Sequence, residues 1–246
     1  MKTNCWLTNK PIAHRGLFDN QTLPENSLAA FDNAVKHGFA IELDVQMTKD
    51  GVLVVFHDDT LDRMTNATGV VEKMDYNQIK DITLLDTDCK IPTFKQILEL
   101  VDGKTELLIE IKPYNNVGCV EEKVAELLDG YKGDFAIESF NPLILRWFKK
   151  HRPNFVCGQL ASECNGIPIP KFQKFVIKHM VLCRFCGCKF VAYNVNDIAK
   201  VKRVQRLRKK MPVLGWTVCS QNHYEQTKQH YDNMIFDSFV PLKENN

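Results

Sequence analysis

The chain has 246 residues, of which 32 are basic and 30 acidic, so its formal net charge is +2. Hydrophobic residues make up 44% of the sequence, which is enough to fill a full core and excludes a disordered or fibrous protein. No recognised motif or aromatic platform supports nucleic-acid binding.

The sequence also bears on where the protein resides. The first ten residues hold no apolar run of signal-peptide length, and no segment reaches the length of a membrane span. We therefore expect a cytoplasmic protein with no stable membrane insertion. Its nine cysteines are then expected to remain reduced thiols. Nothing in the sequence indicates an oligomeric state.

Apolar and β-branched runs predict nine strands along the chain, with helical patterns between most of them. The expected strands are Ile12–Arg15, Ile41–Val45, Val52–Phe56, Leu107–Ile111, Phe135–Ser139, Phe155–Leu160, Phe190–Val195, Val213–Val218 and Met234–Phe236. The expected helices are Ser27–His37, Phe94–Val101, Val120–Leu128, Leu143–Lys150, Ile198–Lys209 and Asn222–His230.

This alternation of strands and helices predicts an α/β fold with a parallel sheet. Parallel neighbours need a crossover of a dozen or more residues, and the turn at Lys49–Gly51 is too short for one. The strand at about 52–57 is therefore expected to be an extra antiparallel strand. Eight parallel strands remain, as in a (β/α)8 TIM barrel. We expect a single domain over residues 1–246, with a small excursion at about 60–92.

Two acidic residues, Glu42 and Asp44, lie in an apolar strand. Both point to the same face, because side chains alternate along a strand. Adjacent carboxylates in such a strand are electrostatically costly, and a divalent cation usually relieves that cost. The Asp-Gly turn that follows is a hairpin signal. A hairpin folded symmetrically about Lys49 and Asp50 would place His57 opposite Glu42.

A second charged pair follows in chain order in the segment Leu107–Pro113, which contains the expected strand Leu107–Ile111. Glu110 and Lys112 are two residues apart and share a face, so Glu110 is a candidate third ligand of the same cation. The alternative is an ion pair of Lys112 with Glu110 or Glu42 inside the barrel. Ligation by oxygen alone favours Mg²⁺ or Ca²⁺ over zinc.

The first expected strand ends in His14 and Arg15. A guanidinium matches a phosphate or carboxylate, and an imidazole exchanges protons near neutral pH, so this pair suits an anionic substrate. The alternative is a basic surface loop with no further role.

These residues resemble the glycerophosphodiester phosphodiesterases. The resemblance lies in short motifs that follow one another in the order and approximate spacing of that family. The motifs are His14–Gly16, Pro24–Ser27 with Ala30-Phe31, Ile41–Val45, Thr48–Gly51, Val55–Asp58, Ile91–Thr93, Ile109–Lys112, Ser139–Asn141 and Trp216–Val218.

The resemblance implies a (β/α)8 barrel that hydrolyses glycerophosphodiesters to glycerol 3-phosphate and an alcohol. It implies one divalent cation bound by three carboxylates, and two histidines that act as general acid and general base. The resemblance does not assign which histidine is the acid and which is the base. It also implies residues that bind the phosphate or pack against the substrate. The metal ligands would be Glu42, Asp44 and Glu110, the catalytic histidines His14 and His57, and the substrate-binding residues Arg15, Lys112 and Trp216.

Two other functions remain open. A phospholipase C- or D-like barrel acting on lysophospholipid, or on another lipid or polymer diester, could use a similar two-histidine site. A catalytically silent barrel that binds phosphodiesters is disfavoured, because binding alone needs neither both histidines nor three carboxylates.

Two further features have plain structural explanations. Residues 171–210 hold twelve basic residues and a single acidic one, Asp197. We interpret them as the solvated face of outer helices in preference to peripheral contact with anionic lipid. The spacing of Cys183, Cys186 and Cys188 could begin a metal site, but no second Cys or His pair follows at matching spacing, so zinc is disfavoured.

Overall fold

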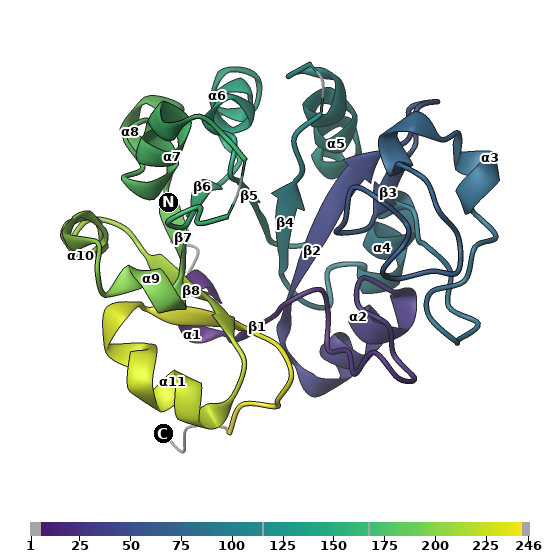
Figure 1. Cartoon of the computed structure of the whole chain (residues 1–246), viewed down its shortest axis with the longest axis horizontal. Coiled ribbons are helices and arrows are strands. Elements are labelled where there is room, and N and C mark those ends of the chain that lie inside the picture. The colour runs from purple at the N-terminus through teal and green to yellow at the C-terminus, as the bar shows by residue number, and fades with distance from the viewer. Residues whose placement is uncertain (1–5, 115, 167, 243–246) are drawn as a thin grey trace. The chain divides into compact units, whose positions relative to one another are not determined.

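The computed structural model describes residues 6–114, 116–166 and 168–242 (Figure 1). Its strands are β1 (Ile12–Ala13), β2 (Ala40–Met47), β3 (Leu53–Val55), β4 (Leu107–Ile111), β5 (Phe135–Ser139), β6 (Cys157–Ala161), β7 (Phe190–Asn194), β8 (Val213–Val218) and β9 (Asn233–Phe236). Its α-helices are α1 (Trp6–Asn9), α2 (Leu28–His37), α3 (Tyr76–Ile79), α4 (Phe94–Val101), α5 (Cys119–Asp129), α6 (Pro142–His151), α7 (Lys171–Lys178), α8 (Cys183–Cys186), α9 (Val195–Ile198), α10 (Lys202–Arg208) and α11 (Gln221–Thr227). Short 3-10 helices are η1 (Val71–Lys73) and η2 (Lys228–His230).

The strands follow the order β1-β9-β8-β7-β6-β5-β4-β2-β3, and β1 also pairs with β2. The second pairing of β1 closes the order into a ring of eight strands, with β3 outside it as the antiparallel extra strand. Helices lie between successive strands of the ring along the chain. This is the topology of a (β/α)8 barrel, so the predicted fold is confirmed.

All nine predicted strands are present, and β4, β5, β8 and the helix α4 have the predicted bounds. The helices α1, α3, α7 and α8 were not predicted. Three of them, α1, α3 and α8, have four residues each, which is too short for a helical period to stand out in the sequence. In α7 no residue is buried, so no apolar face towards the core marks it as a helix.

The single helix predicted over Ile198–Lys209 is wrong. The chain forms the two helices α9 and α10 there, separated by Ala199–Val201. The Asn194 side chain accepts a hydrogen bond from the Asn196 backbone N–H, so α9 begins directly after β7. Val201 then has an extended conformation (φ −107°, ψ 90°), from which α10 begins.

The chain divides into two compact units, which we describe separately. The N-terminal unit comprises residues 13–136, and the C-terminal unit comprises residues 1–12 with 137–246. The single domain expected over residues 1–246 stays a prediction.

In the N-terminal unit, β2 pairs in parallel with β4 and antiparallel with β3, and every residue of β2 is buried. The helix α2 begins where the Ser27 side chain accepts a hydrogen bond from the Ala30 N–H, and it ends at Gly38 in the left-handed conformation (φ 75°). A capping box between Thr93 and Gln96 begins α4. These caps set where the helices beside β2 start.

The β2–β3 register differs from the prediction by one residue. Val45 lies opposite Val55, whereas symmetry about Lys49 and Asp50 would place it opposite Val54. The reason is a three-residue loop: Thr48 N donates to Val52 O, and Gly51 takes a left-handed conformation (φ 83°). The prediction that His57 lies opposite Glu42 in the hairpin is therefore wrong, and β3 itself ends at Val55.

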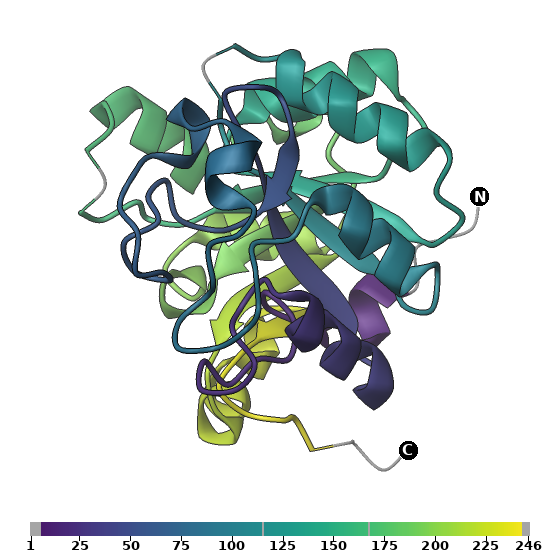
Figure 2. The same cartoon turned by 90° about the vertical axis from the view of Figure 1, so that its right-hand side faces the viewer.

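The excursion after β3 has its own small core. Figure 2 shows it as the blue loops and short helices on the left, and it includes η1 and α3. The buried side chains of this core are Val54, Phe56, Leu61, Met64, Val71, Ile79, Leu84 and Ile91. Packing of this kind holds a long connection in one conformation, so side chains at its start, around Asp58 and Arg63, have fixed positions.

In the C-terminal unit, β5–β6, β6–β7, β7–β8 and β8–β9 are parallel pairs. Asn141 caps α6, and Pro142 occupies its first turn, where no backbone N–H is needed. Within residues 6–114, 116–166 and 168–242, no helix has the length and apolar character to cross a membrane.

Candidate active site

Three carboxylates meet on one face of β2 and β4 in the N-terminal unit. The parallel register places Asp44 directly beside Glu110, and Glu42 lies on the same face of β2. One oxygen from each residue lies within 4.8 Å of the others. The three side chains are buried, with exposed fractions of 2% for Glu42, 0% for Asp44 and 8% for Glu110. The three carboxylates therefore lie close together, as the sequence predicts.

Lys112 lies between two of these carboxylates. Its Nζ atom is 2.8 Å from Asp44 Oδ1 and 2.8 Å from Glu110 Oε1. Burial would lower the pKa of Lys112, but the charges of Asp44 and Glu110 outweigh burial and raise it. The lysine is thus a fixed positive charge, and the ion pair considered as an alternative is present beside the carboxylate cluster.

One ammonium does not satisfy three carboxylates. Burial, and then the nearby charge of Asp44, raise the pKa of Glu110 to about 7 although Lys112 opposes the shift. Burial also disfavours the charged form of Asp44, but Lys112, His57 and Arg15 together hold its pKa well below the usual range. A hard divalent cation fits this oxygen cluster, because it would add positive charge beside the buried carboxylates that Lys112 alone does not balance.

The turn after β1 brings His14 and Arg15 to the same carboxylates. Arg15 N donates a 2.9 Å hydrogen bond to Glu42 Oε2, and His14 Nε2 lies 4.0 Å from that oxygen. Arg15 has a left-handed backbone (φ 55°), as does Gly16 (φ 85°). A Cβ at Gly16 would lie 2.9 Å from the Ala30 carbonyl carbon, so only glycine fits the turn against α2. The histidine beside Glu42 is His14.

Arg15 and Asn26 contact the second carboxylate of the cluster, Asp44. Asn26 Nδ2 donates a 2.8 Å hydrogen bond to Asp44 Oδ2, and Arg15 Nε lies 3.5 Å from the same oxygen. Asn26 N donates to Arg15 O, which links the two segments. In the sequence, Asn26 is recognisable only as part of the family motif Pro24–Ser27. No local pattern indicates its contact with Asp44, 18 residues further along the chain.

His57 lies just after β3, in the segment that leaves the β2–β3 ladder. Its Nδ1 atom is 2.6 Å from Asp58 Oδ1. Since the pKa of Asp58 is lowered, Asp58 is ionised near neutral pH and can only accept, so Nδ1 donates the hydrogen bond. The neutral imidazole then has its lone pair on Nε2. Burial, the largest influence, lowers the pKa of His57, which favours this neutral form.

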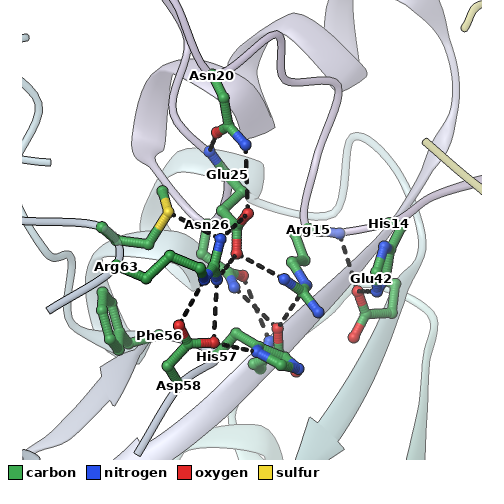
Figure 3. Close-up of polar contacts among 12 residues, drawn as sticks. His14, Arg15, Asn20, Glu25, Asn26, Glu42, Phe56, His57, Asp58 and Arg63 are labelled. Carbon is green, nitrogen blue, oxygen red and sulfur yellow. Dashed lines mark hydrogen bonds and ion pairs between the residues drawn. The ribbon is translucent and has the colours of Figure 1, made fainter. Parts of the chain in front are cut away.

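Arg63 links the His57–Asp58 pair to Glu25, which contacts Arg15 (Figure 3). Its guanidinium donates to Asp58 (Nε to Oδ2, 2.5 Å) and to Glu25 (Nη2 to Oε1, 2.7 Å). Glu25 in turn accepts a 2.6 Å hydrogen bond from Arg15 Nη1. A continuous chain of charged contacts therefore runs from His57 through Asp58, Arg63 and Glu25 to Arg15. Sequence reasoning missed Arg63, because nothing local ties the excursion to residues near 25.

Asp58 makes stability depend on pH. Burial by itself would raise its pKa, but hydrogen bonds from Arg63 and His57 outweigh burial and lower the pKa to about 2 from the ordinary value of 3.8. Between about pH 4 and about pH 2 the unfolded carboxyl binds a proton that the folded protein does not, so lowering the pH through this window lowers the free energy of unfolding.

We expect urea unfolding to reveal this dependence. The stability difference between the wild type and Asp58→Asn should be larger at about pH 6 than at about pH 2, because the contribution of the ionised carboxylate is lost on acidification. A difference that is equal at both pH values would contradict the assigned partners of Asp58.

Trp216 belongs to the C-terminal unit, on β8. Its ring makes an edge-on contact with Phe140, with ring centroids 5.6 Å apart. Its Nε1 atom is buried and has no hydrogen-bond partner among residues 6–114, 116–166 and 168–242. A substrate-binding role for Trp216 stays a prediction.

The three cysteines of the sequence cluster are buried in the C-terminal unit. Cys183 begins the one-turn helix α8 and Cys188 follows its end, where Cys188 N donates to Cys183 O and Gly187 N donates to Arg184 O. This is a Schellman helix end, which places the side chains of its first and last residues together. Cys183, Cys186 and Cys188 are thus buried side chains packed around a helix end.

Comparison with known proteins identifies the family. The sequence model described as "Glycerophosphoryl diester phosphodiesterase family" matches residues 14–240. The chain belongs to this family. Its glycerophosphodiester phosphodiesterase relative from Caldanaerobacter subterraneus is 39% identical over 220 residues, which cover 78% of this chain and 88% of the relative. Glycerophosphodiester phosphodiesterase 1 of Homo sapiens is 25% identical over 93% of this chain and 76% of its own length.

Solved structures of the family share the fold. An Oleispira antarctica phosphodiesterase in complex with the product sn-glycerol-3-phosphate has a TM-score of 0.78 and 22% identity, covering 94% of this chain and 93% of that one. The glycerophosphodiester phosphodiesterase of Thermotoga maritima has a TM-score of 0.72 and 24% identity, with coverage of 92% and 93%. The predicted membership of the phosphodiesterase family, and with it the classification as an enzyme, is confirmed.

Proposed function

We propose that the chain hydrolyses glycerophosphodiesters to glycerol 3-phosphate and an alcohol, with a divalent cation held by Glu42, Asp44 and Glu110. The observation that supports this proposal most directly is the buried carboxylate cluster, whose oxygens lie within 4.8 Å of one another. Oxygen ligands alone suit Mg²⁺ or Ca²⁺. When bound, the cation would supply positive charge to a phosphoryl oxygen.

The histidines would move the protons of the reaction. His57 offers Nε2 for proton exchange, because Asp58 occupies Nδ1 at 2.6 Å. His14 approaches the same cluster from the turn after β1, with Nε2 4.0 Å from Glu42. One imidazole would take the proton of the nucleophile and the other would give a proton to the departing alkoxide. Either assignment of acid and base fits these contacts.

Arg15 and Lys112 would bind the phosphate group. Two of the three N–H donors of Lys112 point to Asp44 and Glu110, which leaves one for a phosphate oxygen. The Arg15 guanidinium has five donors, of which Nη1 is used by Glu25 and Nε lies near Asp44. The two cations would thus orient the phosphodiester while they hold the carboxylates in place.

The test is release of glycerol 3-phosphate from glycerophosphocholine and glycerophosphoethanolamine by the purified protein in EDTA, Mg²⁺ or Ca²⁺. We expect turnover that one cation restores and that His14→Ala removes. Turnover that EDTA leaves unchanged would contradict the metal proposal. If neither substrate is cleaved with either cation, the proposal is wrong. The two remaining hypotheses would then be an enzyme that acts on a lipid or polymer diester and a catalytically silent barrel. The leaving alcohol and the cytoplasmic location stay predictions.

Arg63 should act as a positioning residue for His57. We expect Arg63→Ala to lower kcat about 10- to 100-fold with little change in KM, because Asp58 and therefore the imidazole lose their support. Arg63→Lys keeps the charge but cannot span Glu25 and Asp58 together, so it should fall between the wild type and the alanine variant. An increase in KM alone would instead indicate that Arg63 acts on substrate binding, through Glu25 and Arg15, and does not position His57.

A further inference from the structure

The helix α7 of the C-terminal unit carries aromatic side chains that point to solvent. Phe172 is 75% exposed and Phe175 is 55% exposed. No residue of α7 is buried, and only part of its surface, including Val176 and Ile177, is half-buried. A surface helix of a globular protein normally turns its apolar side chains towards the core. Exposed phenylalanines on such a helix therefore need an explanation other than packing within the protein.

These side chains belong to a local concentration of exposed apolar residues. Of the nine large apolar side chains that are exposed in the described part of the chain, four lie between residues 172 and 185. Val181 is 41% exposed and Phe185 is 49% exposed, and all the exposed phenylalanines among them are in this segment. A local patch of this kind marks an interaction surface more often than scattered single residues do.

The same surface is strongly basic. Phe175 and Val181 line a shallow pocket of about 520 Å³ together with Lys200, Lys202 and Arg203, and no acidic side chain lines it. Arg206, one turn along α10 from Lys202, also lines the pocket. Figure 1 shows α7 and α10 at the left of the view. We call this surface, formed by the exposed side chains of residues 171–181 and 200–206, the α7–α10 face.

Much of the positive charge is not neutralised by neighbouring carboxylates. Lys200 lies 3.9 Å from Asp197, and Lys178 forms a 2.6 Å ion pair with Glu163. Lys202, Arg203 and Arg206 have no salt bridge to a carboxylate of the residues that the structure describes. All three are exposed, so their field reaches solvent.

The sequence alone favours a solvated basic face here, but the exposed Phe172 and Phe175 change that interpretation. We propose that the α7–α10 face docks the protein on an anionic lipid bilayer. The basic side chains would lie among the lipid phosphates, while Phe172 and Phe175 would enter the boundary between headgroups and acyl chains. Charge complementarity favours an anionic bilayer as the partner. The apolar side chains of the face match the boundary between headgroups and acyl chains, and its basic side chains match negatively charged headgroups. A neutral bilayer would match only the apolar side chains. None of the residues that form this face is among those proposed for catalysis, metal binding or substrate binding.

Vesicle co-sedimentation tests the proposal. The full chain is mixed with phosphatidylcholine vesicles, with or without phosphatidylglycerol, at low and at physiological salt. We expect binding to the anionic vesicles only, weakened by salt because screening shortens the reach of the charges. Failure to bind anionic vesicles at low salt would overturn the proposal. So would binding to single-stranded nucleic acid in a parallel assay without binding to vesicles.

Two double variants locate the contact. Phe172→Ser with Phe175→Ser removes the aromatic side chains, and Lys202→Glu with Arg206→Glu reverses the charges. Each should weaken vesicle binding about tenfold or more, since lost apolar insertion and repulsion from anionic headgroups both oppose docking.

The matched control, Lys95→Glu with Lys104→Glu, changes the net charge by the same amount on exposed positions of the N-terminal unit. It should bind as the wild type does. An equal loss in the control would show that binding depends on total charge and would overturn the assignment of the face. Circular dichroism and unchanged turnover of water-soluble glycerophosphocholine would establish that the variants are folded, whichever way vesicle binding changes.

Discussion

Glu42→Gln is expected to abolish metal-dependent turnover while the protein stays folded. Gln removes one negative charge from the carboxylate cluster but keeps the shape of Glu42 and an oxygen that can accept the 2.9 Å hydrogen bond from Arg15 N. Charge stabilisation by a cation contributes several kcal/mol, so we expect a loss of at least about a thousandfold.

Glu42 is a better choice for this test than Asp44. Neutralising Asp44 would leave the buried charge of Lys112 partly unpaired and would disturb the hydrogen bond from Asn26, both of which threaten folding. Release of glycerol 3-phosphate measures turnover, and calorimetric titration with Mg²⁺ or Ca²⁺ measures cation affinity. Glu99→Gln, on the exposed side of α4, is the matched control and should leave both unchanged. Unchanged turnover in Glu42→Gln would refute the metal assignment.

His57→Ala is expected to lower the rate about a hundredfold or more. The imidazole is held by Asp58 at 2.6 Å with Nε2 available, which is the arrangement that a general acid or base needs. Removal of such a group typically costs between about a hundredfold and about ten-thousandfold. The bell-shaped plot of kcat/KM against pH should also lose one of its two slopes in the variant, because that slope reflects the ionisation of the His57 imidazole.

The control for this variant is His37→Ala. His37 ends α2 in the same unit, is exposed, and bonds only its own helix through the Asn33 carbonyl among its described contacts. Its loss should leave turnover within about twofold of the wild type. A loss below about tenfold in His57→Ala would remove His57 from proton transfer, and the pair of His14 and His57 would then no longer explain the reaction.

The strand and helix pattern was predictable because it is local. Strand β4 has the predicted bounds, since four apolar residues, interrupted only by Glu110, lie between the polar Glu106 and Lys112 in the sequence. The acidic cluster was predictable for a related reason. Side chains alternate along a strand, so Glu42 and Asp44 share a face whatever the strand packs against. The parallel pairing of β2 with β4 then brings in Glu110.

Other features depended on contacts between distant segments. The turn of the β2–β3 hairpin has three residues, Lys49–Gly51, so the register differs by one residue from the expected one and His57 does not pair with Glu42. A one-residue change of this kind cannot be read from hydrophobic pattern, because the same turn sequence fits two loop lengths. Arg63 joins Glu25 to Asp58 only because the excursion folds back over the site.

By itself, the sequence determined the alternation of strands and helices, the charged residues on the strand faces and the resemblance to a phosphodiesterase family. Those properties follow from the chemistry and period of neighbouring residues. The tertiary structure decided that His14 lies beside Glu42, that Asp58 and Arg63 support His57, and that Phe172 is exposed rather than packed. The physical reason is that pairing register, ion-pair partners and burial are set by packing between segments far apart in the chain, and local preferences do not encode that packing.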